Sequence, residues 1–327
     1  MDLSIVVVSY KTPHLLKKCV ESIYAFKEDL SIEVIIVDND SGDESKQLVM
    51  TNFPDVNWID SGYNAGFSRA NNIGIKQAKG DYIVVLNPDS FVKEGFFKKY
   101  LNFYKEKDRN NKLGLLGCRI ISSIDASLLV GSGVNFPGLY KYINANPIYI
   151  FLKRQFKRKD KKYLPKVMHY KNHEIDFVSG ACVMIKKSKI IENNLFLDED
   201  FFLYFEDVEW SYRVRDKGFF NYFYSEIEVY HVNSASTNNS PFKNYQIQIS
   251  EYLYFYKVFS SAKYALWSIL VRFNFLLNRV LIKKDKDPEL WGSIQKEKKV
   301  FDTYFKKIKG EYKRAPSSAS KFLKYVE

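Results

Sequence analysis

A set of acidic side chains and one late histidine could together hold a cation against a phosphate-bearing ligand. The set consists of Asp38, Asp40, Asp89, Glu206, Asp207 and His231. Because acids dominate the set and the whole chain has 4 histidines, a hard divalent cation suits it better than zinc. A cation bound by two or three protein groups would be completed by phosphate oxygens of the ligand. That arrangement is expected for a nucleotide diphosphate.

Several of these residues lie where predicted strands end. Runs rich in β-branched residues predict buried strands over residues 3–10, 32–40, 56–61 and 81–87. Helical patterns alternate with them, after Thr12-Pro13, from residues 41–49 and over residues 68–78. This β-α-β-α-β-α-β order predicts an α/β fold with a doubly wound, mainly parallel sheet and helices on both faces. Such a sheet binds ligands at the carboxyl ends of its strands.

Polar clusters follow all four predicted strands, at residues 9–10, 38–43, 61–68 and 87–90. A turn explains any one of them, since Asn, Asp, Ser, Gly and Pro favour turns. Acids, amides and glycines at four consecutive strand ends predict instead a single ligand-binding crevice.

Later segments predict shorter elements. Residues 175–188 predict two short strands on either side of Ser179 and Gly180. Glu206 and Asp207 form an acidic turn before a helix that ends at Gly218. A further strand is followed by a polar loop that contains His231.

Residues 246–327 predict a basic amphipathic helical region. Residues 251–327 contain 17 Lys or Arg and 8 Asp or Glu, which supplies most of the net charge of +12. An apolar stripe at helical spacing predicts a helix over 252–282, with Lys257, Arg272 and Arg279 on the opposite side. The stripe consists of Phe255, Phe259, Ala262, Leu266, Ile269, Phe273, Leu276 and Val280. It either packs on the rest of the protein or lies in a membrane interface.

Other classes of protein find less support. No GxGxxG, GxxxxGK[ST] or GxSxG pattern is present, which speaks against dinucleotide, P-loop and α/β-hydrolase proteins. A nucleic-acid-binding protein would explain the charge, including a basic run at 153–166, and a sugar nucleotidyltransferase could share the sheet, but the usual motifs of both are missing. Three scattered cysteines indicate a reduced compartment. We expect no signal peptide and no membrane-spanning helix.

Six longer motifs occur in an order and at spacings that are specific when taken together. They are SIVVVSYK, IIVDNDSGD, NAGFSRANNIGI, GDYIVVLNPDS, FVSGACVMIKKS and FFLYFEDVEWSYRVRDKGF. Over roughly residues 3–235 the chain thereby resembles glycosyltransferase family 2, inverting enzymes with the GT-A fold, and within it the bacterial rhamnosyltransferase-like branch. The resemblance implies a GT-A domain at 1–245, with a nucleotide-binding half at 1–111 and an acceptor-side half at 112–245. The C-terminal region at 246–327 is not covered.

The resemblance assigns a nucleotide-binding group. Its members are Ser9, Tyr10, Asp38, Asp40, Asn64, Gly66 and Asn87. Asp38 is suited to accept a hydrogen bond from the N3–H of a pyrimidine, and Asp40 either supports this pocket or caps a helix. Asn64 and Gly66 resemble the loop over the nucleotide, although a tight turn also explains Gly66. Arg69, on the following helix, is expected to be solvated.

The same resemblance implies a metal group and a base. Asn87-Pro88-Asp89 is similar to the family's DxD motif, with Asn87 in place of the first acid, so that Asp89 and His231 would bind divalent Mg or Mn. The alternative for His231 is a loop histidine satisfied by its neighbours. Asp207 resembles the catalytic base, and Gly180 and Glu206 lie in the vicinity of the donor sugar and acceptor. The alternative for the two acids is stabilisation of a helix N-terminus.

The implied function is transfer of a sugar from a nucleotide-diphosphate donor to a hydroxyl of a glycan or lipid-linked glycan, in bacterial surface polysaccharide synthesis. Rhamnose from dTDP-rhamnose is the favoured donor, with a UDP-hexose or UDP-galactofuranose as the alternative. A sugar hydroxyl needs a positioned base before it attacks. We expect a cytoplasmic protein at the inner face of the cell membrane, in peripheral contact with anionic lipid and with no nucleic-acid partner.

Overall fold

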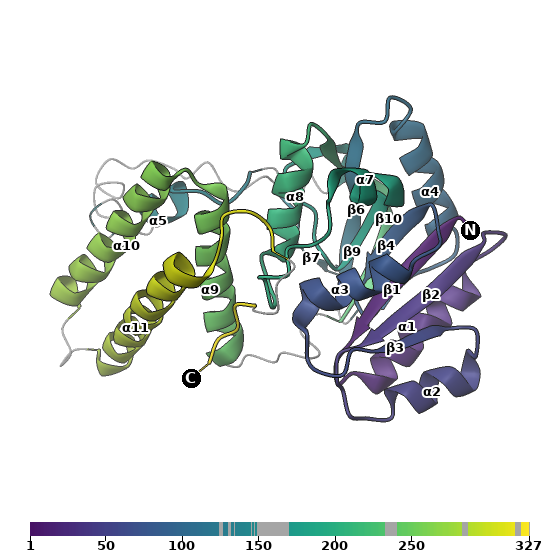
Figure 1. Cartoon of the computed structure of the whole chain (residues 1–327), viewed down its shortest axis with the longest axis horizontal. Helices are drawn as coiled ribbons and strands as arrows, with labels where there is room; N and C mark the ends of the chain where they lie inside the picture. Colours follow the sequence, from purple (N-terminus) through teal and green to yellow (C-terminus); the bar gives the residue numbers. More distant parts are fainter. Residues whose placement is uncertain are drawn as a thin grey trace.

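The computed structural model describes residues 1–123, 127–129, 132–133, 135–144, 146, 148, 170–232, 241–282, 287–317 and 322–326. The basic run at 153–166 lies outside these ranges. Within them, a ten-stranded sheet carries helices on both faces, and α9, α10 and α11 stand beside it (Figure 1).

The strands are β1 (Leu3–Ser9), β2 (Ile32–Asp38), β3 (Asn57–Asp60), β4 (Tyr82–Leu86), β5 (Ser90–Phe91), β6 (Leu113–Ser122), β7 (Leu128–Leu129), β8 (His173–Ile175), β9 (Cys182–Lys186) and β10 (Phe220–His231). The helices are α1 (Pro13–Ala25), α2 (Ser45–Asn52), α3 (Gly66–Gln77), α4 (Phe96–Lys107), α5 (Tyr140–Asn144), α7 (Lys187–Asn193), α8 (Glu206–Asp216), α9 (Pro241–Val258), α10 (Ser261–Leu281) and α11 (Pro288–Glu311).

The sheet has a parallel half that the first four strands build. The strand order across the whole sheet is β3-β2-β1-β4-β9-β6-β10-β5. β1 pairs in parallel with β2 and β4, β2 with β3, and β6 with β10, whereas β9 runs antiparallel between β4 and β6. The predicted mainly parallel α/β fold with C-terminal helices is confirmed.

β1 shows why both faces of the sheet are covered. Leu3, Ile5 and Val7 pack into the core on the side of α1 and α4, whereas Val6 and Val8 pack with α3 and α8 on the other side. Successive side chains of a strand point to opposite faces, so a continuous apolar run requires a helix layer on each. Each such side chain contributes about 1.5–3 kcal/mol when it leaves water.

Two details of the middle of the chain differ from the sequence prediction. Short strands do lie on either side of Ser179 and Gly180, but the first of them, β8, already ends at Ile175, and the second is β9. His231 does not lie in a loop, since it is the last residue of β10 and pairs with Ser90 of β5. Both differences arise from pairing with distant segments, which local propensity does not encode.

The predicted helix over 252–282 is in fact two helices. α9 ends at Val258, and Ser260 caps α10 by accepting a hydrogen bond from the backbone N–H of Lys263 at 3.3 Å. The predicted boundary between residues 1–245 and 246–327 lies inside α9. The division of the chain into these two regions stays a prediction. No helix in the described residues has the length and apolarity needed to cross a bilayer.

Lys257 of α9 joins the C-terminal helices to the segment that precedes α8. Its ammonium lies 2.6 Å from Asp198 Oδ2 and 2.7 Å from Asp200 Oδ2, and both carboxylates are buried. Two backbone N–H groups add to the junction, from Ser317 to Asp198 Oδ1 at 3.0 Å and from Leu323 to the Asp200 carbonyl at 2.7 Å. The buried acids therefore depend on one cation from a distant helix.

We expect Lys257→Met to lower the free energy of unfolding by about 3–5 kcal/mol, because it leaves two buried carboxylates without their cation. Urea denaturation measures this change. Lys299→Met, at an exposed position of α11, is the control and should cost less than about 0.5 kcal/mol. Equal losses in the two variants would contradict the assigned role of Lys257.

Candidate active site

The carboxyl edge of the parallel strands gathers most of the predicted site residues. Ser9 and Asp38 end β1 and β2, and they are register partners. Asn87 follows β4, and His231 ends β10. Because β9 runs antiparallel to β4, its start lies at this same edge, and Ala181 there accepts a hydrogen bond from the Asn87 backbone N–H at 3.0 Å.

Ser9 and Asp38 present unused polar atoms at this edge. Asp38 Oδ2 accepts from the Ser41 backbone N–H at 3.1 Å. Asp38 Oδ1 and Ser9 Oγ are buried and have no hydrogen-bond partner among the described residues. Leaving a buried polar atom unpaired costs about 1–3 kcal/mol, so two such atoms side by side favour a ligand that supplies donors.

Tyr10 and Asp40 stand farther out. Tyr10 is half-buried, with the Lys11 ammonium 5.3 Å from its ring centroid. Asp40 is exposed and adopts a left-handed backbone with φ 64°. The alternative role of Asp40 as a helix cap is wrong, because α2 begins at Ser45 with Glu44 before it.

Asn39 holds the loop before α3, and the sequence prediction missed it. Its Nδ2 donates to Asn64 Oδ1 at 3.0 Å and to the Gly66 carbonyl at 3.3 Å, while its Oδ1 accepts from the Ala65 backbone N–H at 2.7 Å. Asn39 is buried between the two acids of the sequence Asp-Asn-Asp. The sequence did contain a signal for this role of Asn39. An amide side chain offers both a donor and an acceptor, whereas a carboxylate offers only acceptors.

Gly66 begins α3 at a point where the chain has no room for a side chain. Its φ is +75°, and a Cβ there would lie 2.4 Å from the Phe202 carbonyl oxygen. The same carbonyl accepts from the Phe67 backbone N–H at 2.7 Å. The glycine therefore does more than form a tight turn, because it lets the loop dock on the segment that leads to Asp207.

Arg69 extends this docking, and the expectation of a solvated side chain is wrong. It is 7% exposed, and its Nε lies 3.2 Å from Glu199 Oε2. A second guanidinium nitrogen donates to the Tyr63 hydroxyl at 3.0 Å, and the group also lies 5.0 Å from the Phe322 ring centroid. Arg69 thus links the loop before α3 to the acidic segment that Lys257 anchors.

Asn87, Asp89 and His231 meet in a second group. His231 Nε2 lies 2.9 Å from Asp89 Oδ1 and 3.2 Å from Asn87 Nδ2. Asp89 and His231 are 6% and 8% exposed, which is low for residues at a strand end. The pairing of His231 with Ser90 of β5 brings the histidine to the turn that contains Asp89.

This second group fits a divalent cation. Neighbouring ligands of an octahedral ion, with bonds of about 2.1 Å, lie about 3 Å apart, which matches the separation of Asp89 Oδ1 and His231 Nε2. The amide of Asn87 can turn its oxygen toward the same point. No cluster of three His, Cys, Asp or Glu side chains occurs in the part of the chain that the structure describes, so other ligands would come from the bound molecule and water.

Asp207 is presented by a strained turn at the start of α8. Tyr204 and Phe205 both have left-handed backbones, with φ 69° and 67°. Asp207 Oδ2 accepts from the Gly180 backbone N–H at 2.9 Å, and Oδ1 accepts from the Val208 backbone N–H at 2.8 Å. Non-glycine residues in this conformation cost energy and concentrate at functional sites.

Burial shapes the protonation of the two acids of α8. It raises the pKa of Asp207, and the hydrogen bonds from Gly180 and Val208 oppose that rise. Glu206 is buried, and its Oε2 has no partner among the described residues. Burial and then the charge of Asp207 raise the pKa of Glu206 well above its usual range. Asp207, which keeps partial access to solvent, is therefore the better proton acceptor of the two.

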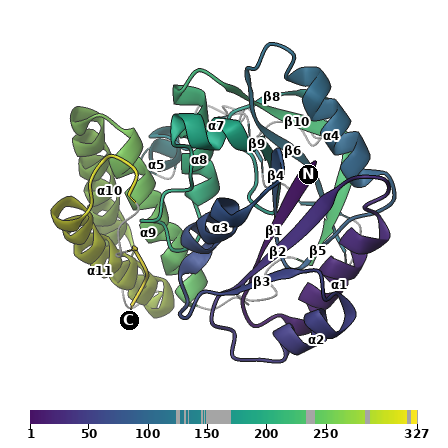
Figure 2. The same ribbon diagram turned by 45° about the vertical axis from the view of Figure 1, so that its right-hand side comes forward.

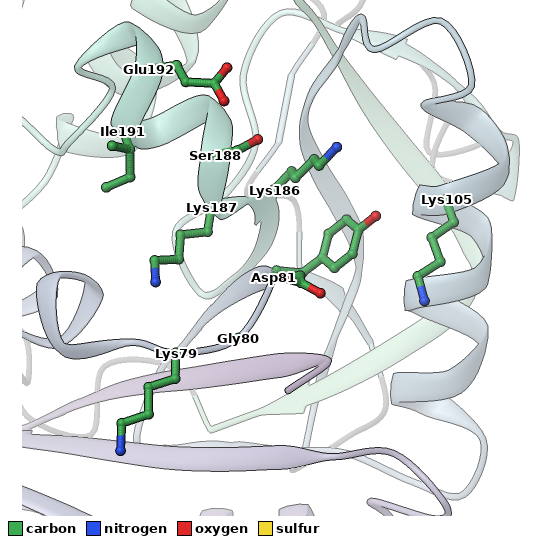
Figure 3. A pocket seen from close by; sticks show the side chains of 10 residues that line it. Lys79, Gly80, Asp81, Lys105, Lys186, Lys187, Ser188, Ile191 and Glu192 are labelled. Carbon is green, nitrogen blue, oxygen red and sulfur yellow. The ribbon is translucent and has the colours of Figure 1, made fainter.

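A separate cavity of about 570 Å³ lies at the opposite edge of the sheet (Figure 3). It is lined by Lys79, Gly80, Asp81, Tyr82, Lys105, Lys186, Lys187, Ser188, Ile191 and Glu192. The amino group of Lys187 donates to the Ala78 carbonyl at 2.6 Å, and Figure 3 shows Lys79 and Lys105 on opposite sides of the opening. The lysines do not converge on a common point, and none of the predicted site residues lines this cavity.

Solved structures identify the class of fold. GalNAc-T7 with UDP, GalNAc and Mn²⁺ superposes with a TM-score of 0.54 at 15% identity, over 79% of this chain and 50% of that chain. This likeness shows a fold of the GT-A type. The family model described as glycosyl transferase family 2 matches residues 4–193, and the chain belongs to that family.

Individual relatives share a low sequence identity with this chain. The low-salt glycan biosynthesis hexosyltransferase Agl10 of Haloferax volcanii is 27% identical over 219 residues, which is 65% of this chain and 62% of the relative. The N-acetylglucosaminyl-diphospho-decaprenol L-rhamnosyltransferase of Mycobacterium tuberculosis is 24% identical over 252 residues, 73% of this chain and 78% of the relative. The chain thus spans less than two thirds of the haloarchaeal protein.

We expect Gly66→Ala to destabilise the protein more than Gly62→Ala, which is its matched control. Both glycines have left-handed backbones, with φ +75° and +76°, but a Cβ at Gly62 would meet no atom within 4 Å. Gly62→Ala should cost about 1 kcal/mol of backbone strain. Gly66→Ala should cost about 1–3 kcal/mol more because of the clash with Phe202. Urea denaturation of both variants measures the difference, and equal costs would mean that the loop does not dock as described.

Proposed function

We propose that the protein is an inverting glycosyltransferase, which moves a sugar from a nucleotide-diphosphate donor to a hydroxyl of a glycan or lipid-linked glycan. One observation carries this proposal. The backbone of Gly180 binds Asp207, and the next residue, Ala181, binds the backbone of Asn87, beside Asp89 and His231. The proposed proton acceptor and the proposed cation-binding group are therefore both held by the adjacent residues Gly180 and Ala181.

In the proposed reaction, an Asp207 carboxylate oxygen takes the proton of the acceptor hydroxyl as that hydroxyl oxygen attacks the anomeric carbon. The new bond joins the acceptor oxygen to the anomeric carbon, while the bond from that carbon to the diphosphate breaks. The nucleoside diphosphate leaves with the electron pair. A single displacement inverts the anomeric configuration, unlike the double displacement of retaining glycosidases.

Two groups of residues would hold the donor. The free Asp38 Oδ1 would accept from the N3–H of a pyrimidine base beside Ser9, with Tyr10 and Asp40 farther out. The loop of Asn64 and Gly66, fixed by Asn39, would cover the nucleotide. Asp89 and His231, with the Asn87 amide oxygen, would hold a Mg or Mn ion, which when bound neutralises charge on the diphosphate.

The donor is proposed to be dTDP-rhamnose. Support comes from the mycobacterial relative, which is named as an N-acetylglucosaminyl-diphospho-decaprenol L-rhamnosyltransferase. A UDP-hexose or UDP-galactofuranose is the alternative, and the hexosyltransferase name of the haloarchaeal relative favours a hexose. A lipid-linked acceptor would place the protein at the inner face of the cell membrane in the synthesis of surface polysaccharide.

A panel of nucleotide sugars tests the proposal as a whole. The protein is incubated with Mg²⁺ or Mn²⁺ and each donor, and release of the nucleoside diphosphate is measured with and without glycan or lipid-linked acceptors. One donor should be consumed far faster than the others. Consumption of a nucleoside triphosphate with a sugar phosphate would instead point to a nucleotidyltransferase.

We expect Asp207→Asn to reduce transfer by about 10²–10⁴-fold, because an amide cannot accept the proton of the hydroxyl. Binding of UDP and dTDP, measured by calorimetry, should change little. Asp216→Asn, at the exposed end of the same helix, is the control and should transfer at the normal rate. Substantial transfer by Asp207→Asn would remove Asp207 from the role of base.

The pH dependence of the transfer rate is a second test of the role of Asp207. Because burial raises the pKa of Asp207, its active carboxylate form is lost at a higher pH than for an ordinary Asp, whose pKa is about 3.9. Transfer should therefore fall as the pH drops through this raised pKa. A wild-type rate that stays constant down to pH 4 would contradict the assignment.

We expect Asp89→Asn to remove the metal-dependent part of nucleotide binding, because it deletes the one carboxylate of the Asn87, Asp89 and His231 group. Calorimetry with UDP and dTDP is done with and without Mg²⁺. In the wild type Mg²⁺ should tighten binding, and in the variant this gain should disappear. Asp55→Ala, at an exposed turn, is the control. An equal gain in Asp89→Asn would exclude Asp89 as a ligand.

A further inference from the structure

One side of α10 exposes a continuous apolar surface, here named the α10 outer face. It consists of Leu266, Ile269, Phe273, Leu276 and Val280, which are 55%, 63%, 44%, 57% and 69% exposed. Their spacing of three and four residues puts them on one side of the helix. The opposite side, with Tyr264, Trp267 and Val271, is buried against α9 and α11. The helix is thus apolar on two sides and covered on only one of them.

The apolar stripe predicted from the sequence does not pack on the rest of the protein over its whole length, because the residues of the α10 outer face are exposed. Phe255 and Phe259, at the start of the predicted stripe, do pack in the core of the C-terminal helices. Beyond the break at Ser260 the stripe turns outward. Figures 1 and 2 both place α10 on the side of the molecule away from the sheet, with α9 between them.

The charges around the outer face are positive. α10 contains Lys263, Arg272 and Arg279 and no acidic residue. Together α10 and α11 contain nine Lys or Arg and four Asp or Glu. Arg272 is paired with Asp302 of α11 at 3.1 Å. Lys263 and Arg279 are the two cations of α10 that form no ion pair with the described residues. Exposed Leu, Ile and Phe beside basic residues are the composition of a helix that lies in a membrane interface.

We propose that the α10 outer face inserts into the interface of an anionic membrane, with Lys263 and Arg279 on the lipid phosphates. A second copy of this chain is a poorer occupant. In a two-fold contact between outer faces the basic residues of each α10 would approach those of the other, with no acid on either α10 to pair with them. A lipid surface offers both the apolar layer and the anions that this face lacks.

The same contact would anchor the catalytic base. Val208, next to Asp207, packs in the core of the C-terminal helices, and Lys257 of α9 holds the acidic segment before α8. A helix group resting on the membrane would therefore hold the start of α8 at a fixed place relative to the bilayer. Membrane binding itself does not depend on which sugar is transferred.

Co-sedimentation with lipid vesicles tests the proposal. The wild-type chain should bind vesicles of phosphatidylglycerol and phosphatidylcholine, bind pure phosphatidylcholine weakly, and lose affinity as NaCl is added. The double variant Ile269→Gln, Phe273→Gln should bind the anionic vesicles at least about tenfold more weakly, because two apolar side chains no longer enter the interface. Ile191→Gln, at an exposed position of α7, is the control and should bind normally.

Two further measurements keep the outcome unambiguous. Arg279→Gln should weaken binding to anionic vesicles and reduce its dependence on salt, although it leaves the apolar residues in place. All variants should keep the wild-type melting temperature and UDP or dTDP binding, so a loss of vesicle binding is separate from a failure of the proposed transferase. Unchanged vesicle binding by the double variant would overturn the proposal. A wild-type dimer in light scattering that the double variant converts to monomer would also overturn it.

Discussion

Two hydrogen bonds at the start of β9 hold the site together. Gly180 donates its backbone N–H to Asp207, and Ala181 accepts from the backbone of Asn87. They exist because β9 runs against the direction of β4, so that its first residues arrive where the parallel strands end. Without this reversal, the acids of the first half and those of α8 would belong to separate surfaces. The turn with left-handed Tyr204 and Phe205 then completes the geometry from the other side.

Acidic groups gather along the carboxyl edge of the sheet, from Asp38 and Asp89 to Glu206 and Asp207. Burial raises the pKa of Glu206 and of Asp207. Asp38 is partly satisfied by Ser41, Asp89 by His231, and Asp207 by two backbone donors. Burial raises the pKa of Asp207 although backbone donors oppose the rise, which suits the role of base that we propose for it. Away from this edge, the buried Asp198 and Asp200 are paired with Lys257.

The sequence predicted the parts that depend on local pattern and strand order. The parallel strands, their polar ends and a helix next to Glu206 and Asp207 follow from runs of β-branched residues and turn chemistry, although the helix already includes the two acids. What it missed depends on contacts between distant segments. The burial of Arg69 depends on Glu199, and His231 joins a strand because of Ser90. The break after Val258 turns most of the apolar stripe outward. The role of Asn39 was not predicted, because the prediction rested on the two acids beside it. Its amide nevertheless fixes the loop before α3.

We propose that one base and a single displacement transfer the sugar at this edge of the sheet. The most direct test is the stereochemistry of the product. With the donor that the protein consumes, proton NMR of the first product formed should show an anomeric configuration opposite to that of the donor. A product with retained configuration would require a second displacement and a second nucleophile, and it would contradict the account.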